Sequence, residues 1–368
     1  MELLFLGTSS GTPTLSRNVS GLLLRMKRGT WLFDCGEGTQ HRLLQARVIP
    51  SSISKIFISH MHGDHIFGLP GLLLSIMDSR DELGLSKDAP LHIYGPKGLG
   101  QYIWANLSMS ASGLTIPVTI HELGHDAPGA FSLDSHGRFQ VRPVLRIDSP
   151  GGGFHWDLFD DERISAKTSL LKHRVPCFGY VVEETYERKV DPLRARGWGL
   201  EPGPMFAKLE RGETVRLPNG TVVRPDDVLE APTQRKVCIL GDTCDSSNLA
   251  TVAQNADVLV HEATFENKYE DKALVSTHST AGMAGAFARD IGAKLLILTH
   301  FSKRYESLEV RERSLDGESG DASSLSSQAI RRLVTQAMST FRSNKVIAAE
   351  DFKRIQVPRS VRIEVGEP

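Results

Sequence analysis

The stretch His60-Met61-His62-Gly63-Asp64-His65 holds three histidines and one carboxylate within six residues. It follows directly on the apolar run Ile56–Ser59, which predicts a buried strand. Neutral imidazole nitrogen and carboxylate oxygen are the ligands that zinc prefers. A loop at the end of a strand can turn these side chains toward one point, whereas helical spacing would separate them. The stretch therefore predicts a metal site at the edge of a sheet.

Further candidate ligands follow other predicted strands. The apolar runs Val237–Leu240, Asp257–Val260 and Lys294–Leu298 are each followed closely by a polar residue: Asp242, His261 and His300. Rigid strands fix the loops that follow them, so ligands gather at such edges. His173 stands between two basic residues, a setting that by itself is more typical of a solvated surface histidine.

The alternation of elements predicts the architecture. Short apolar strands dominate the first half, with helices expected at Ile66–Met77 and near Leu99–Leu107; the second half has a helix at Ala281–Ile291 between two strands. Strands that alternate with helices indicate layered α/β structure. We therefore expect one domain over residues 1–368, an α/β four-layer αβ/βα sandwich.

Two segments read as insertions into that domain. Residues 186–220 are dense in Gly and Pro, which argues against a packed core and for a protruding arm or long loop; we place the arm itself at 186–211. It has a modest basic excess and carries Trp198. Residues 306–327 are rich in Glu, Ser and Asp, which predicts a polar surface loop.

Composition restricts the class of protein without naming a partner. Hydrophobic residues make up 40% and charged residues 24%, as expected of a globular protein with a sizeable core. The formal net charge of -1 neither requires nor excludes nucleic acid. No stretch approaches the roughly 20 apolar residues of a spanning helix, so we expect no membrane association. Four scattered cysteines without a CxxC pair indicate free thiols in a reducing cytoplasm.

The order of the candidate ligands resembles that of the metallo-β-lactamase superfamily. There an HxHxDH motif is followed by a later histidine, an aspartate in a Gly-Asp-Thr turn and a last histidine after a strand. The resemblance implies two zinc ions per subunit: one bound by His60, His62 and His173, one by Asp64, His65 and His300, with Asp242 bridging both. It also raises His173 from a surface residue to a ligand. Mn²⁺ or Fe²⁺ could occupy the same ligands.

Further segments resemble the ribonuclease Z family in particular. These are Phe33–Gln40 (FDCGEGTQ), Gly68–Leu72 (GLPGL), His261–Thr264 (HEAT), His278–Thr280 (HST) and Glu201–Pro204 (EPGP). The family removes the 3′ trailer of precursor tRNA, leaving a tRNA 3′-hydroxyl and a 5′-phosphorylated trailer. Its members are homodimers in which the arm of one subunit serves the active site of its partner. The resemblance implies this activity, this assembly and a cytoplasmic location.

The resemblance also implies roles for individual residues. Asp64 would be both ligand and general base, and His278 the general acid, because histidine titrates near neutrality. His261 and Glu262 would orient His278 or contact a metal ligand; for His261 a core-edge histidine with a structural role is the alternative. Substrate contacts would come from Arg17, Asn18, Gly203 and Pro204. Leu15 stands where the family has a lysine, which leaves discrimination at the CCA end open.

Two other functions compete with this interpretation. A metallo-β-lactamase-fold hydrolase of small esters or cyclic phosphodiesters would use the same metal site, but it would work without the arm. An RNA-binding relative without activity would have damaged ligands, and all seven expected ligands are present.

Overall fold

Two large mixed sheets face each other in the computed structural model, which describes residues 1–27, 29–86, 88–124, 131–132, 137–148, 153–161, 163–305 and 323–361. The first sheet has nine strands in the order β19 (Arg354–Gln356), β1 (Glu2–Gly7), β2 (Gly21–Met26), β3 (Gly29–Phe33), β4 (Ile53–Phe57), β5 (Leu91–Pro96), β6 (Val118–Leu123), β8 (Phe139–Val144) and β7 (Phe131–Ser132). From β3 to β8 neighbouring strands are parallel, so their carboxyl ends share one edge.

The second sheet is built from the later part of the chain. Its order is β18 (Val346–Ala348), β17 (Leu296–Thr299), β16 (Val258–Glu262), β15 (Thr233–Leu240), β12 (Cys177–Thr185), β11 (Ile164–Leu171), β10 (Phe154–Asp161) and β9 (Ile147–Asp148), with β20 (Ser360–Val361) paired to β15. Strands β15, β16, β17 and β18 are parallel, whereas β12 is antiparallel to β15. The loops after β15, β16 and β17 therefore leave the sheet at one edge.

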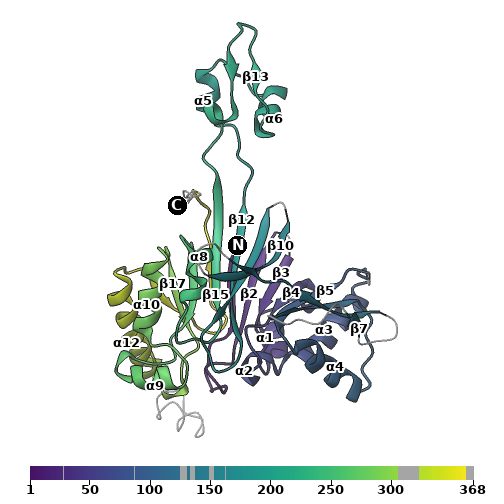
Figure 1. Cartoon of the computed structure of the whole chain (residues 1–368), viewed down its shortest axis with the longest axis vertical. Coiled ribbons are helices and arrows are strands. Elements are labelled where there is room, and N and C mark those ends of the chain that lie inside the picture. The colour runs from purple at the N-terminus through teal and green to yellow at the C-terminus, as the bar shows by residue number, and fades with distance from the viewer. Residues whose placement is uncertain are drawn as a thin grey trace.

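Helices cover the outer face of each sheet (Figure 1). On the first sheet these are α1 (Thr39–Gln45), α2 (Gly63–Ile66), α3 (Leu69–Glu82) and α4 (Leu99–Met109). On the second they are α8 (Ala250–Ala253), α9 (Glu270–Val275), α10 (Ala281–Asp290) and α12 (Ser323–Phe341). Short 3₁₀ turns lie at Pro50–Ser52, Ser247–Leu249, Asn267–Tyr269 and Lys303–Tyr305. This is the expected αβ/βα order of four layers.

Three apolar cores hold these layers together. The central core, between the two sheets, includes Phe57, Tyr94 and Tyr180, whose rings pack at centroid distances of 5.0 and 5.3 Å. The other two cores lie between each sheet and its helices. Within the described part of the chain, no helix is both long enough and apolar enough to span a membrane.

The predicted helix at Ile66–Met77 is interrupted in the structure. Helix α2 ends at Ile66 and α3 begins at Leu69, with Pro70 in its first turn. Proline is tolerated in the first turn of a helix but cannot continue one, because it lacks a backbone N–H. The break separates the short helix that carries Asp64 and His65 from the longer helix that packs on the sheet.

The arm is larger than predicted and has its own core. It leaves the second sheet after β12 and returns at β15, where the Tyr186 amide donates to the Thr233 carbonyl. It contains α5 (Pro192–Gly197), α6 (Pro204–Glu210), β13 (Val215–Arg216), β14 (Val222–Val223) and α7 (Pro225–Val228). Its buried residues form a separate cluster: Val190, Ala195, Leu200, Leu209, Val215, Leu217, Val223, Val228 and Leu229.

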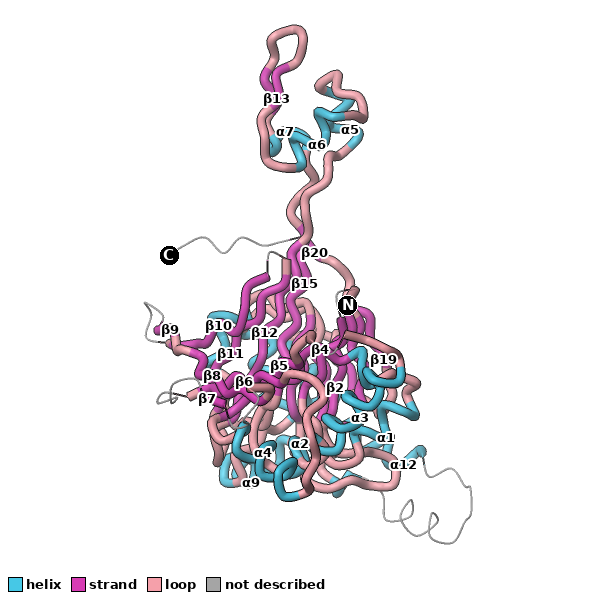
Figure 2. The backbone as a smooth tube through the Cα atoms, turned by 90° about the vertical axis from the view of Figure 1, so that its right-hand side faces the viewer, coloured by secondary structure: helices cyan, strands magenta, loops and turns pink. Residues whose placement is uncertain are grey.

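The arm protrudes from one end of the body on two extended chains (Figure 2). Pro192, Pro204 and Pro225 each begin a short helix, and Gly199, Gly212 and Gly220 lie in turns between elements. The density of these residues therefore marks helix starts and turns and not an absence of packing. Of the polar loop predicted at 306–327, residues 306–322 lie outside the described residues, and helix α12 already begins at Ser323.

Candidate metal centre

The candidate ligands come from strand ends of both sheets and meet between them. His60 and His62 lie in the loop after β4, and His173 lies after β11. Asp242 and His300 follow β15 and β17. Asp64 and His65 lie in α2 and not in the loop, because the chain turns into a helix directly after His62. The structure thus brings together all seven residues of the predicted ligand set.

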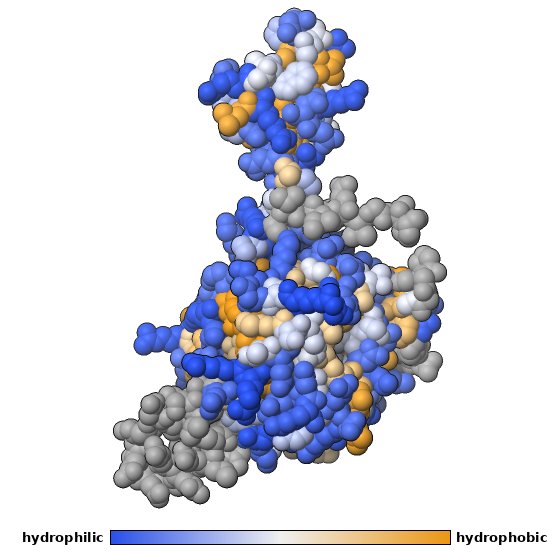
Figure 3. Space-filling view, turned by 90° about the vertical axis from the view of Figure 1, so that its left-hand side faces the viewer, coloured by the Kyte–Doolittle hydropathy of each residue, from blue (hydrophilic) through white to orange (hydrophobic). Residues whose placement is uncertain are grey.

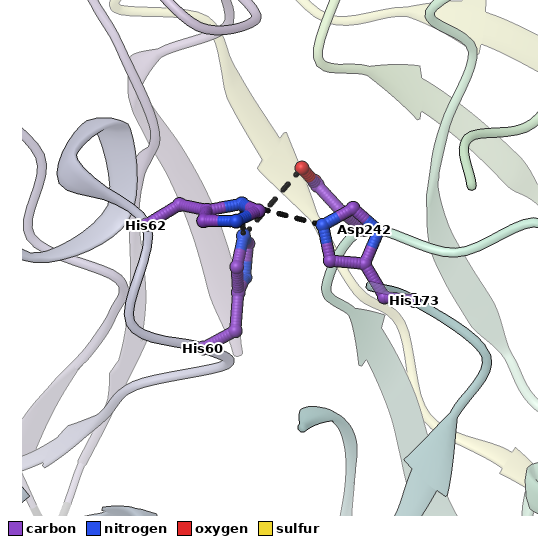
Figure 4. Close-up of side chains that lie close together, drawn as sticks. All are labelled: His60, His62, His173 and Asp242. Atoms are coloured by element: carbon purple, nitrogen blue, oxygen red, sulfur yellow. Dashed lines mark hydrogen bonds and ion pairs between the residues drawn. The ribbon is translucent and has the colours of Figure 1, made fainter. Parts of the chain in front are cut away.

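The first group consists of His60, His62, His173 and Asp242, whose ligand atoms lie within 4.8 Å of one another (Figure 4). His62 Nδ1 is 3.0 Å from His60 Nε2 and 3.3 Å from His173 Nε2. Asp242 Oδ2 is 3.7 Å from His60 Nε2. Ligands about 2.0–2.1 Å from a tetrahedral zinc are about 3.3–3.4 Å apart. These spacings fit a metal ion.

The second group consists of Asp64, His65 and His300. The Nε2 atoms of the two histidines are 3.2 Å apart, and Asp64 Oδ2 lies 3.4 and 3.3 Å from them. Asp242 approaches with its other oxygen: Oδ1 is 3.5 Å from His65 Nε2 and 3.4 Å from His300 Nε2. This donor set also fits a metal ion.

Asp242 connects the two groups because each of its carboxylate oxygens faces a different one. The residue is 3% exposed. Burial opposes its charge, but His300, His65 and His60 outweigh that effect and hold the pKa of Asp242 well below its ordinary range. A buried carboxylate that remains ionised between two sets of imidazoles is suited to bridging two cations.

Asp34 is not a ligand itself but holds two ligand histidines, His65 directly and His60 through Ser59. Its Oδ2 accepts from His65 Nδ1 at 2.7 Å and from the Ser59 hydroxyl at 2.8 Å. Ser59 Oγ in turn lies 2.9 Å from His60 Nδ1. Each contact orients the ring so that Nε2 points into the centre, which is how outer carboxylates usually fix ligand histidines. One side chain therefore supports ligands of both groups.

A second chain of hydrogen bonds joins His300 to His278. Thr264 Oγ1 lies 3.0 Å from His300 Nδ1 and donates to the buried Glu262 carboxylate. His278 Nδ1 lies 3.0 Å from Glu262 Oε1. Burial opposes a charge on His278, but Glu262 and Asp242 outweigh it and raise the pKa of His278 to about 9. Its Nε2 makes no hydrogen bond to the described residues.

His261 lies apart from this centre. Its Nε2 is 2.9 Å from Ser246 Oγ, and its Nδ1 is 2.8 Å from the Glu262 carbonyl oxygen. Successive residues of a strand point to opposite faces, so Glu262 faces the metal centre while His261 faces helix α10, near Phe287. The structure brings Glu262 and His278 together but does not bring His261 to them.

The predicted substrate-binding residues fall in two places. Arg17 is half-buried: it donates to Thr8 Oγ1 and to the Ala349 carbonyl, and it lies over Phe301. Asn18 donates to the Glu37 carbonyl at 2.9 Å. Both belong to the loop that also carries Gly11, whose amide donates to Asp64 Oδ2 at 2.7 Å.

Gly203 and Pro204 lie instead on the arm, where Pro204 begins α6 and both residues are exposed. The arm rises from the end of the body opposite to α2 (Figures 1 and 2). The structure therefore does not bring these two residues to the metal centre of their own chain.

The sequence analysis missed the residues that support the ligands. Asp34 directly follows β3, and His60 comes shortly after β4 in the same sheet, so the position of Asp34 at the shared edge is a usable signal. Thr264 and Thr277 gave no such signal. Thr264 acts through its hydroxyl and Thr277 through its backbone carbonyl, and neither residue type is itself typical of a metal site. Thr277 has a φ of 56°, and its carbonyl accepts from His173 Nδ1 at 2.8 Å.

Comparisons with known proteins agree with this fold. The solved metallo-β-lactamase fold protein YhfI from Bacillus subtilis has a TM-score of 0.56 and 15% identity, covering 96% of this chain and 98% of that one. A family model described as "Anti-Pycsar protein Apyc1" matches residues 1–115, less than half of the chain. Together the two sheets, their helices and the His/Asp centre define a protein of the metallo-β-lactamase fold with a candidate metal centre.

More similar relatives narrow the class. Ribonuclease Z of Microcystis aeruginosa is 40% identical, covering 98% of this chain and 97% of that protein. Zinc phosphodiesterase ELAC protein 1 of Homo sapiens is 39% identical, covering 97% and 99%. The crystal structure of human tRNase Z, short form (ELAC1), has a TM-score of 0.63 at 32% identity, covering 97% and 100%. The chain belongs to the ribonuclease Z family.

Asp34→Asn is expected to lower metal affinity about 10–100-fold, because an amide is a poorer acceptor for His65 and Ser59 and contacts of this kind typically have that effect. Competition with a chelator that reports free zinc would measure the change. Asp78→Asn, on the exposed face of α3, is the matched control. Equal affinity in the two variants would show that Asp34 does not support the ligands.

Proposed function

We propose that this chain is a zinc-dependent endoribonuclease that cuts the 3′ trailer from precursor tRNA by two-metal phosphodiester hydrolysis. Cleavage would leave a 3′-hydroxyl on the tRNA and a 5′-phosphate on the trailer. The observation that carries the proposal is the pair of ligand groups that share Asp242. Family membership supports the substrate, since solved and curated relatives are named tRNase Z and ribonuclease Z.

Two zinc ions per subunit are proposed from the donor sets. The groups offer imidazole nitrogen and carboxylate oxygen, which suit zinc, and the name of the human relative supports that metal. When bound, the ions would activate the attacking water and neutralise charge that develops on the phosphate. His60, His62 and His173 would hold one ion, and Asp64, His65 and His300 the other, with Asp242 shared.

Asp64 is proposed as the general base. Its Oδ2 faces His65 and His300, while its Oδ1 makes no hydrogen bond to the described residues. That oxygen can orient the attacking water and accept its proton. His65 and His300 outweigh the effect of burial and hold the pKa of Asp64 below its ordinary value, so the acceptor is ionised.

His278 is proposed as the general acid. The Glu262 carboxylate holds its Nδ1, which leaves Nε2 to donate a proton to the departing 3′-oxygen of the tRNA. Thr264 and the Thr243 amide fix Glu262 in turn. Glu262 is therefore a positioning residue. His261 is proposed to have a structural role, since both ring nitrogens have partners away from the centre.

A homodimer is proposed because the arm and the metal centre lie at opposite ends of one chain (Figure 1). An arm that grips the tRNA can then serve the centre of a second copy. Exposed Leu44, Ile49 and Leu83 line a groove between α1 and α3 and form an apolar surface for such a contact. A cytoplasmic location is proposed from the four cysteines, which are free and buried.

The arm is proposed as the grip on the tRNA, with Gly203 and Pro204 at its contact surface. Hydrophobic residues lie among hydrophilic ones on the surface of the arm (Figure 3). The exposed large apolar residues of the arm include Leu193, Trp198 and Met205. Arg196, Lys208 and Arg211 add positive charge for phosphates. Arg17 and Asn18, in the loop next to Asp64, are proposed to contact the RNA near the cut.

The first test compares three proteins on a 3′-extended precursor tRNA. Wild type is expected to cut once near the discriminator. Asp64→Ala should lose about 10²–10⁴-fold in kcat, because the base is removed. A variant with residues 188–230 replaced by a short Gly-Ser turn should lose the precursor but still hydrolyse bis(p-nitrophenyl) phosphate, because the arm has a separate core.

A wild type that leaves the precursor intact while hydrolysing small esters or cyclic phosphodiesters would refute the tRNA substrate. It would favour the alternative, a hydrolase of small esters or cyclic phosphodiesters. The assignment of the metal centre would be unaffected.

The general acid is tested by changing the leaving group. His278→Ala is expected to slow precursor cleavage about 10²–10⁴-fold, because the departing alkoxide needs a proton. It should slow bis(p-nitrophenyl) phosphate hydrolysis much less, since p-nitrophenolate leaves without one. Metal content, measured on the same samples, is expected to match wild type. A similar loss on both substrates would show that His278 supports the centre and does not donate the proton.

The dimer is tested by light scattering after gel filtration. Leu44→Glu, at a position 61% exposed, is expected to convert a dimer to monomers, because a charge is buried in the apolar contact. Met109→Glu, at a position 88% exposed and outside the groove, is the control and should stay dimeric. A wild type that is monomeric at all concentrations would refute the proposal.

A further inference from the structure

His62 differs from the other histidine ligands in the way its ring is used. His60, His65, His173 and His300 each turn Nε2 into the centre and place Nδ1 against an oxygen acceptor: Ser59 Oγ, Asp34 Oδ2, the Thr277 carbonyl and Thr264 Oγ1. His62 turns Nδ1 inward, and its Nε2 faces a donor, Arg174 Nε, at 3.1 Å. In four of the five histidines, the ring nitrogen that points away from the centre faces an oxygen acceptor. In His62 that nitrogen faces a guanidinium.

A guanidinium cannot serve as that acceptor. When a neutral imidazole binds a cation through Nδ1, its hydrogen is on Nε2, so Nε2 donates. Arg174 is always protonated and only donates. Two N–H groups would then stand side by side with no acceptor between them. A negatively charged oxygen placed beside them satisfies both.

The backbone holds Arg174 at this position. Its amide donates to Thr277 Oγ1 at 3.1 Å, and the Thr277 carbonyl accepts from His173 Nδ1. Thr277 thus fixes Arg174 and a metal ligand together, one residue before His278. The Arg174 residue is exposed. Its charge is therefore presented to solvent at the rim of the centre, beside the proposed acid.

We propose that Arg174 and the Nε2–H of His62 together bind a non-bridging oxygen of an RNA backbone phosphate at or next to the cleaved junction. This rests on the proposed function, because it assigns a subsite for that substrate. A guanidinium is suited to the role, since its planar fork can give one N–H to the same oxygen as His62 and another to a second phosphate oxygen. His62 then has two tasks, as a ligand and as a substrate contact.

The subsite is tested by removing a negative charge from the RNA and the positive charge of Arg174 from the protein. Three precursor tRNAs are made with a single neutral methylphosphonate: at the cleaved junction, or one phosphate to either side of it. Binding is measured with Asp64→Ala protein, which is expected to cut too slowly to disturb the measurement, with and without Arg174→Ala. Arg174→Lys and Lys172→Ala are added in the same background. Lys172 is an exposed cation two residues away and is the matched control.

Arg174→Ala is expected to weaken binding of the unmodified RNA about 10–100-fold, as for loss of a charge-assisted contact. The loss should nearly vanish for one of the three methylphosphonate RNAs, which identifies the phosphate. Arg174→Lys should recover part of the affinity, because the charge stays but the fork is lost. Lys172→Ala should weaken all four RNAs by the same small factor.

The binding measurements would overturn the proposal in either of two cases. The Arg174→Ala loss could be equal on all four RNAs, which would indicate general attraction only, or there could be no loss at all. Zinc content of the single Arg174→Ala variant is measured as well, and a fall would show that Arg174 instead supports His62 as a ligand. Failure of the proposed function is distinguishable, because wild type would then not cut the unmodified precursor.

Discussion

The buried carboxylate of Asp242 is the constraint on which the rest of the centre depends. An ionised group at 3% exposure is costly unless positive charge compensates it. Its two oxygens face different groups of imidazoles, so neither group can shift without disturbing the other. The residue lies just after a strand of the second sheet, while the stretch His60–His65 follows a strand of the first. The charge of Asp242 therefore stabilises the centre only when the two sheets are packed against each other through the central core.

Three of the eight non-glycine residues with a positive φ in the described part of the chain lie around the same point. Asp34, Thr277 and His300 have φ values of 58°, 56° and 58°, a region that side chains other than glycine rarely occupy. Such residues cost on the order of 1–3 kcal/mol each and persist only where surrounding contacts fix them. Here each one either binds a neighbouring ligand through an outer contact or is itself a proposed ligand. The strained backbone at these residues is compensated by the contacts that orient the imidazole rings.

Much of this arrangement is predictable from the sequence. The stretch His60–His65 and Asp242 follow recognisable strands. Neighbouring parallel strands end at the same edge of a sheet, so the segments that follow them are expected to lie close together. The direction of each side chain does not follow. His261 and Glu262 are adjacent, and both were predicted to support His278, yet strand alternation turns His261 toward helix α10 and Glu262 toward His278.

The arm shows a second limit of sequence patterns. Its glycine and proline content suggested loose structure, but the apolar residues between the turns meet in a small core. That core depends on contacts such as Val190 with Leu229, an isolated bridge between segments far apart in the chain. The glycine and proline content of a segment predicts turns, but it does not predict which distant segments pair with each other.

The order of the strands along the chain has a consequence for biosynthesis. Ligands come from residues 60 to 300, and the last of them follows β17. A nascent chain that has completed strands β1 to β8 and the arm still lacks His300, so the second group of donors is incomplete until late in translation. Metal binding is coupled to folding when ligands come from distant segments. The nuclease centre is therefore assembled only after most of the protein has left the ribosome, and incomplete chains have no complete site with which to cut RNA.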